Sequence, residues 1–378
     1  MTLPTWRRSA PLLLTLTLAA CAAPPPPPGV VPSAGPTAAP GERPASAAPA
    51  SATPSGAATA SPVPTATPAG PALPSLATGS LLRRYDFKGL GGLHYDRAGD
   101  VLHVIDAVND DVTPRRYLLR RFKRDGTFEV AVGLGLEDEQ APDAVDGYAF
   151  GAFGTPFYTY REDERLVLRR LYTATPRDAE DFPSYRTARA GVAALRAEGT
   201  VLTMALLRLD AEEKAARTTN KRDIVYVQAD PERDPLAVFQ VPDPFVPTRR
   251  LALAPGGALY LLGATRGGTL GAKRLDATQQ LTDVALGLTR MPDLVTFDAA
   301  GRLWLAYNST GAEPATVAVH DPTGALLRSQ PVTLADGARV YDVRGLVFDR
   351  AGVPLLAGSA IYADLRRVHG IFEFKPAS

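Results

Sequence analysis

The chain has 378 residues, with 41 lysines and arginines against 40 aspartates and glutamates, so its formal net charge is +1. A nucleic-acid-binding protein normally shows a basic excess or a basic stripe, and we therefore expect no nucleic acid among its partners. The composition changes at residue 78: alanine and proline dominate the first part, whereas nearly all charged residues lie in residues 79–378.

Residues 1–20 have the pattern of a secretory signal peptide. Arg7 and Arg8 form a basic start, and the apolar run that follows is too short to span a bilayer. The stretch Leu18-Ala-Ala-Cys21 then resembles the lipobox of bacterial lipoproteins; the alternative is a chance match in an alanine-rich segment. The resemblance implies that Cys21 carries lipid and anchors the chain to a membrane of the cell envelope. The resemblance also implies that an aspartate directly after the cysteine would favour the inner membrane. Because residue 22 is an alanine, we expect the outer membrane or the cell surface instead.

Residues 21–78 are predicted to be a disordered tether that begins at the lipidated cysteine. The segment consists almost entirely of alanine, proline, serine, threonine and glycine and contains no aromatic residue. Such a composition cannot bury enough apolar surface to offset the entropy of ordering. We expect this segment to act as a spacer between the membrane and residues 79–378.

Residues 79–378 read as a repeated unit of short β-strands. Each copy has an apolar strand, a tight turn that contains glycine and a second apolar strand, and the copies recur roughly every 50 residues. The turn glycines are Gly99, Gly154, Gly199, Gly257, Gly301 and Gly352. An apolar residue or a tyrosine precedes each by four positions: Tyr95, Phe150, Leu195, Leu253, Phe297 and Phe348.

This repeat predicts an all-β fold, a six-bladed β-propeller of antiparallel four-stranded blades. The alternative is a pair of β-sandwiches. The stretches FDAAGRLWLAYN (297–308) and YDRAGDVLHVIDAVND (95–110) resemble the blade signature of NHL and SMP-30-like propellers. The chain ends in a third strand, and residues 80–87 are similar to the outer strand of the fifth copy. We therefore predict that the N-terminal strand closes the last blade.

Two polar excursions interrupt the repeat, at residues 172–190 and 207–222. The second could form a short charged helix. Long insertions in compact domains are often functional, so these segments are either partner-facing or solvated elaborations.

Familiar catalytic motifs are absent from the sequence, and the four histidines fall in separate strands or turns. We interpret these histidines as structural or exposed residues. With Cys21 assigned to lipid, no cysteine remains for covalent catalysis or for zinc.

The predicted entrance of each innermost strand shows a ring of charged residues. Eight residues before the turn glycines the sequence has Gly91, Asp146, Gly191, Arg249, Asp293 and Arg344. The functional interpretation is that Asp146, Arg249, Asp293 and Arg344 line an axial pocket for an anionic or hydroxylated small molecule. The alternative is a set of ion pairs around a solvated opening.

Calcium is a possible cofactor, with Asp106 and Asn308 as candidate ligands from the ends of two second strands. The resemblance to SMP-30-like lactonases implies a glutamate ligand from an early blade, but the matching position here is Gly91, and the arginines of the ring oppose a cation. We therefore expect a non-catalytic, membrane-anchored scaffold that binds a protein or a small molecule. The alternative is a calcium-dependent lactonase or hydrolase that uses the axial pocket.

Overall fold

The computed structural model describes residues 73–86, 92–107, 117–133, 145–150, 156–162, 165–171, 179–188, 190–198, 201–209, 222–228, 237–242, 244–276, 278 and 280–375. Internal contacts divide the chain into two units, and all described residues belong to the second, Pro68–Ser378. The predicted signal peptide, Cys21 and nearly all of the tether lie outside the described residues. In the described part of the chain, no helix is long and apolar enough to cross a membrane.

The described strands form six four-stranded antiparallel sheets. The first sheet contains β2 (Gly92–Asp96), β3 (Val101–Ala107), β4 (Tyr117–Lys123) and β5 (Phe128–Gly133). The second contains β6 (Val145–Phe150), β7 (Pro156–Glu162), β8 (Arg165–Leu171) and β9 (Ala179–Ala188). The third contains β10 (Ala190–Glu198), β11 (Val201–Leu209), β12 (Arg222–Gln228) and β13 (Ala237–Gln240). The fourth sheet contains β14 (Phe245–Leu253), β15 (Leu259–Thr265), β16 (Leu270–Leu275) and β17 (Leu281–Val284). The fifth contains β18 (Leu294–Phe297), β19 (Leu303–Tyr307), β20 (Thr316–His320) and β21 (Leu326–Pro331). The sixth contains, from its inner strand outward, β22 (Arg339–Phe348), β23 (Pro354–Ile361), β24 (Arg367–Glu373) and β1 (Ser80–Arg84).

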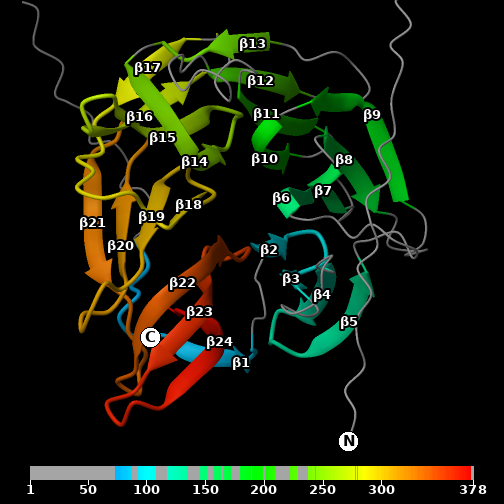
Figure 1. The fold of residues 1–378 in the computed structure, drawn as a ribbon. Helices are drawn as coiled ribbons and strands as arrows, with labels where there is room; N and C mark the ends of the chain where they lie inside the picture. The colour runs from blue at the N-terminus through cyan, green and yellow to red at the C-terminus, as the bar shows by residue number, and fades with distance from the viewer. Residues whose placement is uncertain are drawn as a thin grey trace, which may run out of the picture. The chain divides into compact units, whose positions relative to one another are not determined.

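The first strand of each sheet lies nearest the centre (Figure 1). Each of these inner strands contacts the inner strands of two neighbouring sheets, in the order β2, β6, β10, β14, β18, β22 and back to β2. The apolar clusters lie between adjacent sheets, as where Trp304 of β19 packs on Phe348 of β22. The prediction of an all-β propeller made of antiparallel sheets is therefore confirmed.

The turn after the inner strand depends on one aspartate and one glycine of the repeat. In the fifth sheet, Asp298 Oδ1 accepts hydrogen bonds from the backbone N–H groups of Ala300 and Arg302. Gly301 has φ of 76°, a conformation that glycine adopts without steric cost. The first sheet differs, because Asp100 rather than Gly99 takes the positive φ, at 56°. Aspartate tolerates this conformation better than most side chains do.

The N-terminal strand closes the last sheet, as the sequence predicts. β1 pairs antiparallel with β24, from Ser80 opposite Glu373 to Arg84 opposite Gly370. Leu76, just before β1, is fully buried, and its N–H donates to Gln330 Oε1 of β21 at 3.2 Å. Residues 73–84 therefore attach to both the fifth and the sixth sheets.

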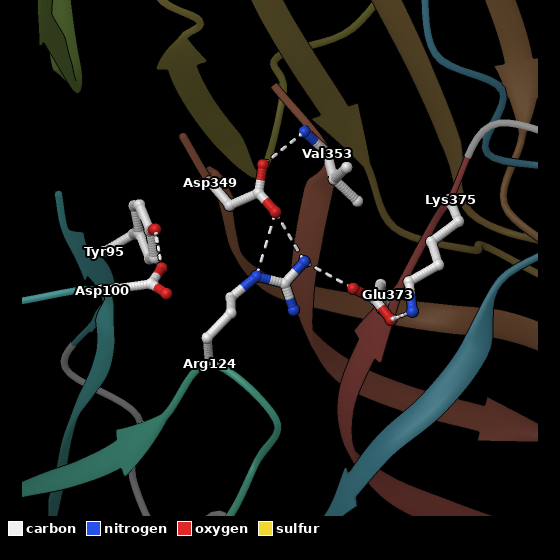
Figure 2. A network of polar contacts seen from close by, with 7 residues as sticks. All are labelled: Tyr95, Asp100, Arg124, Asp349, Val353, Glu373 and Lys375. Atoms are coloured by element: carbon white, nitrogen blue, oxygen red, sulfur yellow. Dashed lines mark hydrogen bonds and ion pairs between the residues drawn. The ribbon is translucent and has the colours of Figure 1, made fainter. Parts of the chain in front are cut away.

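A buried ion network joins the first sheet to the sixth (Figure 2). Arg124, in the turn after β4, donates from Nε and Nη2 to Asp349 Oδ2 at 3.0 and 2.6 Å, and Nη2 also donates to Glu373. Lys375 Nζ lies 3.0 Å from the other oxygen of Glu373. Asp349 and Glu373 are 6% and 5% exposed. The network therefore holds the beginning and the end of the repeat together.

The two polar excursions are shorter than the sequence suggests. Ala179–Ala188 is β9, the outermost strand of the second sheet, and its polar composition suits a sheet edge. The second excursion overlaps the end of β11 and the start of β12. Its central residues 210–221, the candidate for a charged helix, lie outside the described residues.

Candidate axial binding site

The inner strands surround an axial cavity of about 640 Å³ near the ends where they enter their turns. Aromatic rings and a few polar groups from five of the sheets line it: His94, Tyr95, Asp96, Tyr148, Phe150, Arg196, Thr296, Phe297, Asp298 and Phe348. A second cavity of about 390 Å³ shares His94, Tyr148, Arg196 and Thr296 and extends along the inner strands to Arg344. The cavity is therefore continuous with the opening where the charged ring is predicted.

Tyr148 of β6 lines this cavity, and its hydroxyl is buried without a hydrogen-bond partner. The residue is 6% exposed. Burial raises the pKa of Tyr148 well above its usual value, so the hydroxyl stays protonated. A buried hydroxyl without a partner costs free energy in the empty protein, and a ligand that supplies a partner recovers it.

His94 of β2 lies beside Tyr148, with the ring centroids 4.4 Å apart. Burial lowers the pKa of His94 to about 3, so the imidazole is neutral at pH 7, with one donor and one acceptor nitrogen. The imidazole folds back over Gly92, where a Cβ atom would lie 2.5 Å from Nε2. Gly92 therefore leaves the space that His94 occupies in the cavity wall.

His103 of β3 stands behind this wall and pairs with His94 across the strands. His103 is 3% exposed, and neither of its ring nitrogens has a hydrogen-bond partner. The centroids of its ring and of the Phe150 ring are 4.2 Å apart. Burial lowers the pKa of His103 to about 3. The imidazole is therefore neutral in the folded protein at pH values where it is charged in the unfolded chain.

This difference predicts a pH-dependent stability. The unfolded chain binds a proton at His103 below the ordinary pKa of about 6.5, whereas the folded protein does not until about pH 3. As the pH is lowered between these two values, we expect the protonation of His103 in the unfolded chain to reduce the free energy of unfolding by up to about 1.4 kcal/mol per pH unit. Urea denaturation at pH 7, 6 and 5 measures the slope, which His103→Phe should reduce. An unchanged slope in that variant would contradict the assignment.

The rest of the wall combines apolar rings with a guanidinium and a hydroxyl. Arg196 of β10 donates to the backbone oxygen of Leu253 at 3.4 Å, which ties it to the neighbouring inner strand β14. Thr296 of β18 adds a hydroxyl, and Phe297 and Phe348 add aromatic surface. The rings come from the repeat position four residues before the turn glycine, which the sequence analysis identified without assigning it to a site.

The carboxylates at the cavity edge are already occupied. Asp96 accepts from the N–H groups of Ala98 and Gly99, at 2.8 and 3.1 Å. Asp298 Oδ2 accepts from Trp304 Nε1 at 3.0 Å and from Arg302 Nε at 2.5 Å. These two carboxylates stabilise turns, and the remaining polar side chains of the lining include Tyr148, His94, Thr296 and Arg196.

The structure brings two members of the predicted ring into one network. Asp293 Oδ2 accepts from the N–H of Asn308 at 2.7 Å, and Asn308 Nδ2 donates to Asp342 Oδ1 at 3.1 Å. Arg344 Nε lies 2.6 Å from Asp342 Oδ2. The other two ring residues, Asp146 and Arg249, belong to β6 and β14, and their side chains lie outside the described residues.

The candidate calcium ligands are not gathered at one place. Asp106 is 1% exposed and accepts a hydrogen bond from the Tyr85 hydroxyl at 2.7 Å, in the segment that follows β1. Asn308 Oδ1 accepts from the N–H of Val343 at 2.7 Å, so its oxygen is also engaged. Among the described residues, no group of three or more His, Cys, Asp or Glu side chains is placed to hold a metal ion. Calcium takes six to eight oxygen ligands, and this arrangement does not fit it.

His94 and Tyr148 were not identified as site residues from the sequence. Both lie in inner strands, and their exposure to the cavity follows from the closure of the ring rather than from any local motif. A possible signal is a polar or aromatic side chain, five or six residues before the turn glycine, in an otherwise apolar strand.

Comparisons with known proteins find only distant similarity to solved structures. No family model matches the sequence, and no curated protein matches it. A calcium-binding regucalcin from Agrobacterium tumefaciens is similar in structure, with a TM-score of 0.48 and 14% identity over 79% of this chain and 97% of that one. A putative gluconolactonase aligns with a TM-score of 0.46 and 16% identity over 81% and 93% of the two chains. A virginiamycin B lyase from Staphylococcus aureus aligns at 0.40 and 13% over 76% and 94%.

Proposed function

We propose that the protein is a lipid-anchored component of the cell envelope whose six-bladed propeller binds a small hydroxylated molecule in the axial cavity. Cys21 would carry the anchor, and residues 22–72 would hold the propeller away from the membrane, since residues 73–78 pack on the sheets. The observation that carries the binding proposal is a cavity of about 640 Å³ lined by aromatic rings and by polar side chains, among them Tyr148, whose buried hydroxyl has no hydrogen-bond partner.

The wall of the cavity suits a ring that carries hydroxyl groups. The rings of Phe150, Phe297 and Phe348 offer apolar faces, and Tyr148 and His94 offer a donor and an acceptor beside them. Binding sites for small molecules commonly combine a mostly apolar wall with a few well-placed polar groups. Because Tyr148 and His94 are uncharged at neutral pH, they favour hydroxyl and carbonyl groups over ions.

Tyr148→Phe tests this proposal because it removes only the hydroxyl. We expect the free energy of unfolding of the empty protein to rise by about 1 kcal/mol, since an unpaired buried polar group is lost. We expect affinity for a bound sugar, measured by calorimetry with D-glucose and maltose, to fall about tenfold, the value of one hydrogen bond.

Tyr260→Phe is the matched control. Tyr260 is 2% exposed and its hydroxyl donates to the backbone oxygen of Pro322 at 3.1 Å, outside the cavity. This variant should lose about 1 kcal/mol of stability and leave sugar binding unchanged. Equal effects of the two substitutions on binding, or no sugar binding by the full chain, would contradict the proposal.

A calcium-dependent lactonase is the second candidate, because Asp293 and Asp342 bring two carboxylates into one network around Asn308. The further oxygen ligands that calcium requires would have to come from outside the described residues. Metal analysis of the purified protein, with and without a chelator, separates the two functions. Stoichiometric calcium whose removal lowers stability, together with hydrolysis of a lactone such as glucono-1,5-lactone, would replace the binding proposal.

A further inference from the structure

A second pocket, of about 260 Å³, lies between the fifth and sixth sheets and shares no lining residue with the axial cavity. The loop between β19 and β20 forms one wall, and the starts of β22 and β24 with the end of β23 form the other. Its lining residues are Ser309, Gly311, Ala312, Glu313, Arg339, Tyr341, Ile361 and Arg367.

Two arginines face this pocket from one side of the sixth sheet. Arg339 of β22 pairs with Ile361 of β23, and Ile361 pairs with Arg367 of β24. Directly paired residues on adjacent strands point to the same face of a sheet. The Cα atoms of the two arginines are thus two strand spacings apart, roughly 10 Å, and both long side chains can reach a common point.

Neither arginine has a carboxylate partner in the part of the chain that the structure describes. The guanidinium of Arg339 donates to the backbone oxygen of Ala312, which orients it across the pocket. The guanidinium of Arg367 lies 5.8 Å from the centre of the Tyr341 ring. By contrast, Arg124 forms an ion pair with Asp349, which follows β22, and Arg344 forms one with Asp342 within β22.

Two positive charges on one face repel each other, and an anion between them removes that repulsion. A guanidinium has five N–H donors in a planar fork that matches a carboxylate or a phosphate, and most of these donors are not used here. We propose that this pocket binds a small soluble oxyanion, a carboxylate or a phosphate, through Arg339 and Arg367.

Glu313 is the one acidic side chain in the lining of the pocket. Its negative charge opposes an anion bound in the same pocket. Removing this charge should therefore strengthen anion binding, whereas removing either arginine should weaken it.

The test is calorimetric titration of the full chain with inorganic phosphate and with citrate, at constant ionic strength in chloride. We expect saturable binding of at least one of them, with a dissociation constant of about 1 mM. Arg339→Ala and Arg367→Ala should each weaken it at least about tenfold, and Glu313→Gln should tighten it.

Arg366→Ala is the matched control, because the guanidinium of Arg366 packs 4.2 Å from the Tyr362 ring and does not line the pocket. It should change the affinity by less than about twofold, because an exposed guanidinium that packs on Tyr362 outside the pocket is screened by solvent and salt. Equal weakening by Arg366→Ala, or the absence of saturable binding to both anions, would overturn the proposal. Thermal melting of each variant confirms that the fold is retained.

Discussion

A chain that begins at residue 87 is expected to show no cooperative unfolding transition, whereas one that begins at residue 73 should unfold cooperatively. Loss of residues 73–86 removes β1. The edge of β24 that pairs with β1, from Gly370 to Glu373, is then exposed. The deletion also removes Leu76, which is fully buried, and the Tyr85 hydroxyl that donates to buried Asp106. Circular dichroism during heating measures the transition in both chains.

The longer chain is the control for this deletion, because it lacks the tether but keeps every described contact of the N-terminal segment. An exposed strand edge also promotes association, so light scattering should show aggregation of the shorter chain. Equal melting temperatures of the two chains would show that β1 is dispensable and that the last sheet is stable with three strands.

Arg124→Ala is expected to lower the free energy of unfolding by about 3–5 kcal/mol. The substitution leaves Asp349 and Glu373 buried without the guanidinium that both of them contact (Figure 2). Asp349 then keeps the N–H of Val353 but loses its cationic partner, and Glu373 keeps only the largely exposed Lys375 of the two cations that the network gives it. Two buried carboxylates with so little compensation are costly, and they also repel each other. Urea denaturation at pH 7 measures the loss. Arg124→Lys should be intermediate, because lysine keeps the charge but not the forked contact.

Arg121→Ala provides the control, since Arg121 pairs with Glu129 in the same sheet with 41% and 26% of the two side chains exposed. An exposed ion pair contributes at most about 1 kcal/mol, so this variant should remain close to the parent protein. A loss of similar size in both variants would mean that Arg124 acts through general charge rather than through the buried network.

The repeat could be predicted because it depends on residues close together in the chain. Asp298 and Gly301 lie within one turn, and the same pairing of aspartate and glycine appears as Asp349 and Gly352. Local hydrogen bonds and a positive φ are properties of short segments, and they leave a sequence signature. The position of β1 could be inferred for a related reason, because residues 80–87 resemble an outer strand and the last copy lacks one.

The axial site could not be predicted in the same way. Tyr148 and His94 belong to different sheets, and only the contacts between inner strands bring their rings to 4.4 Å. The sequence shows the charged positions of the ring, but it does not show which of them hydrogen-bond to one another. The network that joins Asp293, Asn308 and Asp342 depends on side-chain rotamers, which follow no sequence period. Asp106 shows the same limit, because its partner Tyr85 comes from a segment outside the repeat.

By itself, the sequence determined the β-strand repeat, the turns and the strand that closes the last sheet, because alternation, aspartate and glycine act over a few residues. It also carries the lipobox-like stretch at Cys21, a local pattern whose function stays a prediction. Only the tertiary structure decided which polar groups lack partners and which face a cavity. A missing partner is a property of the whole surroundings of an atom, and those surroundings are assembled from sheets far apart in the chain.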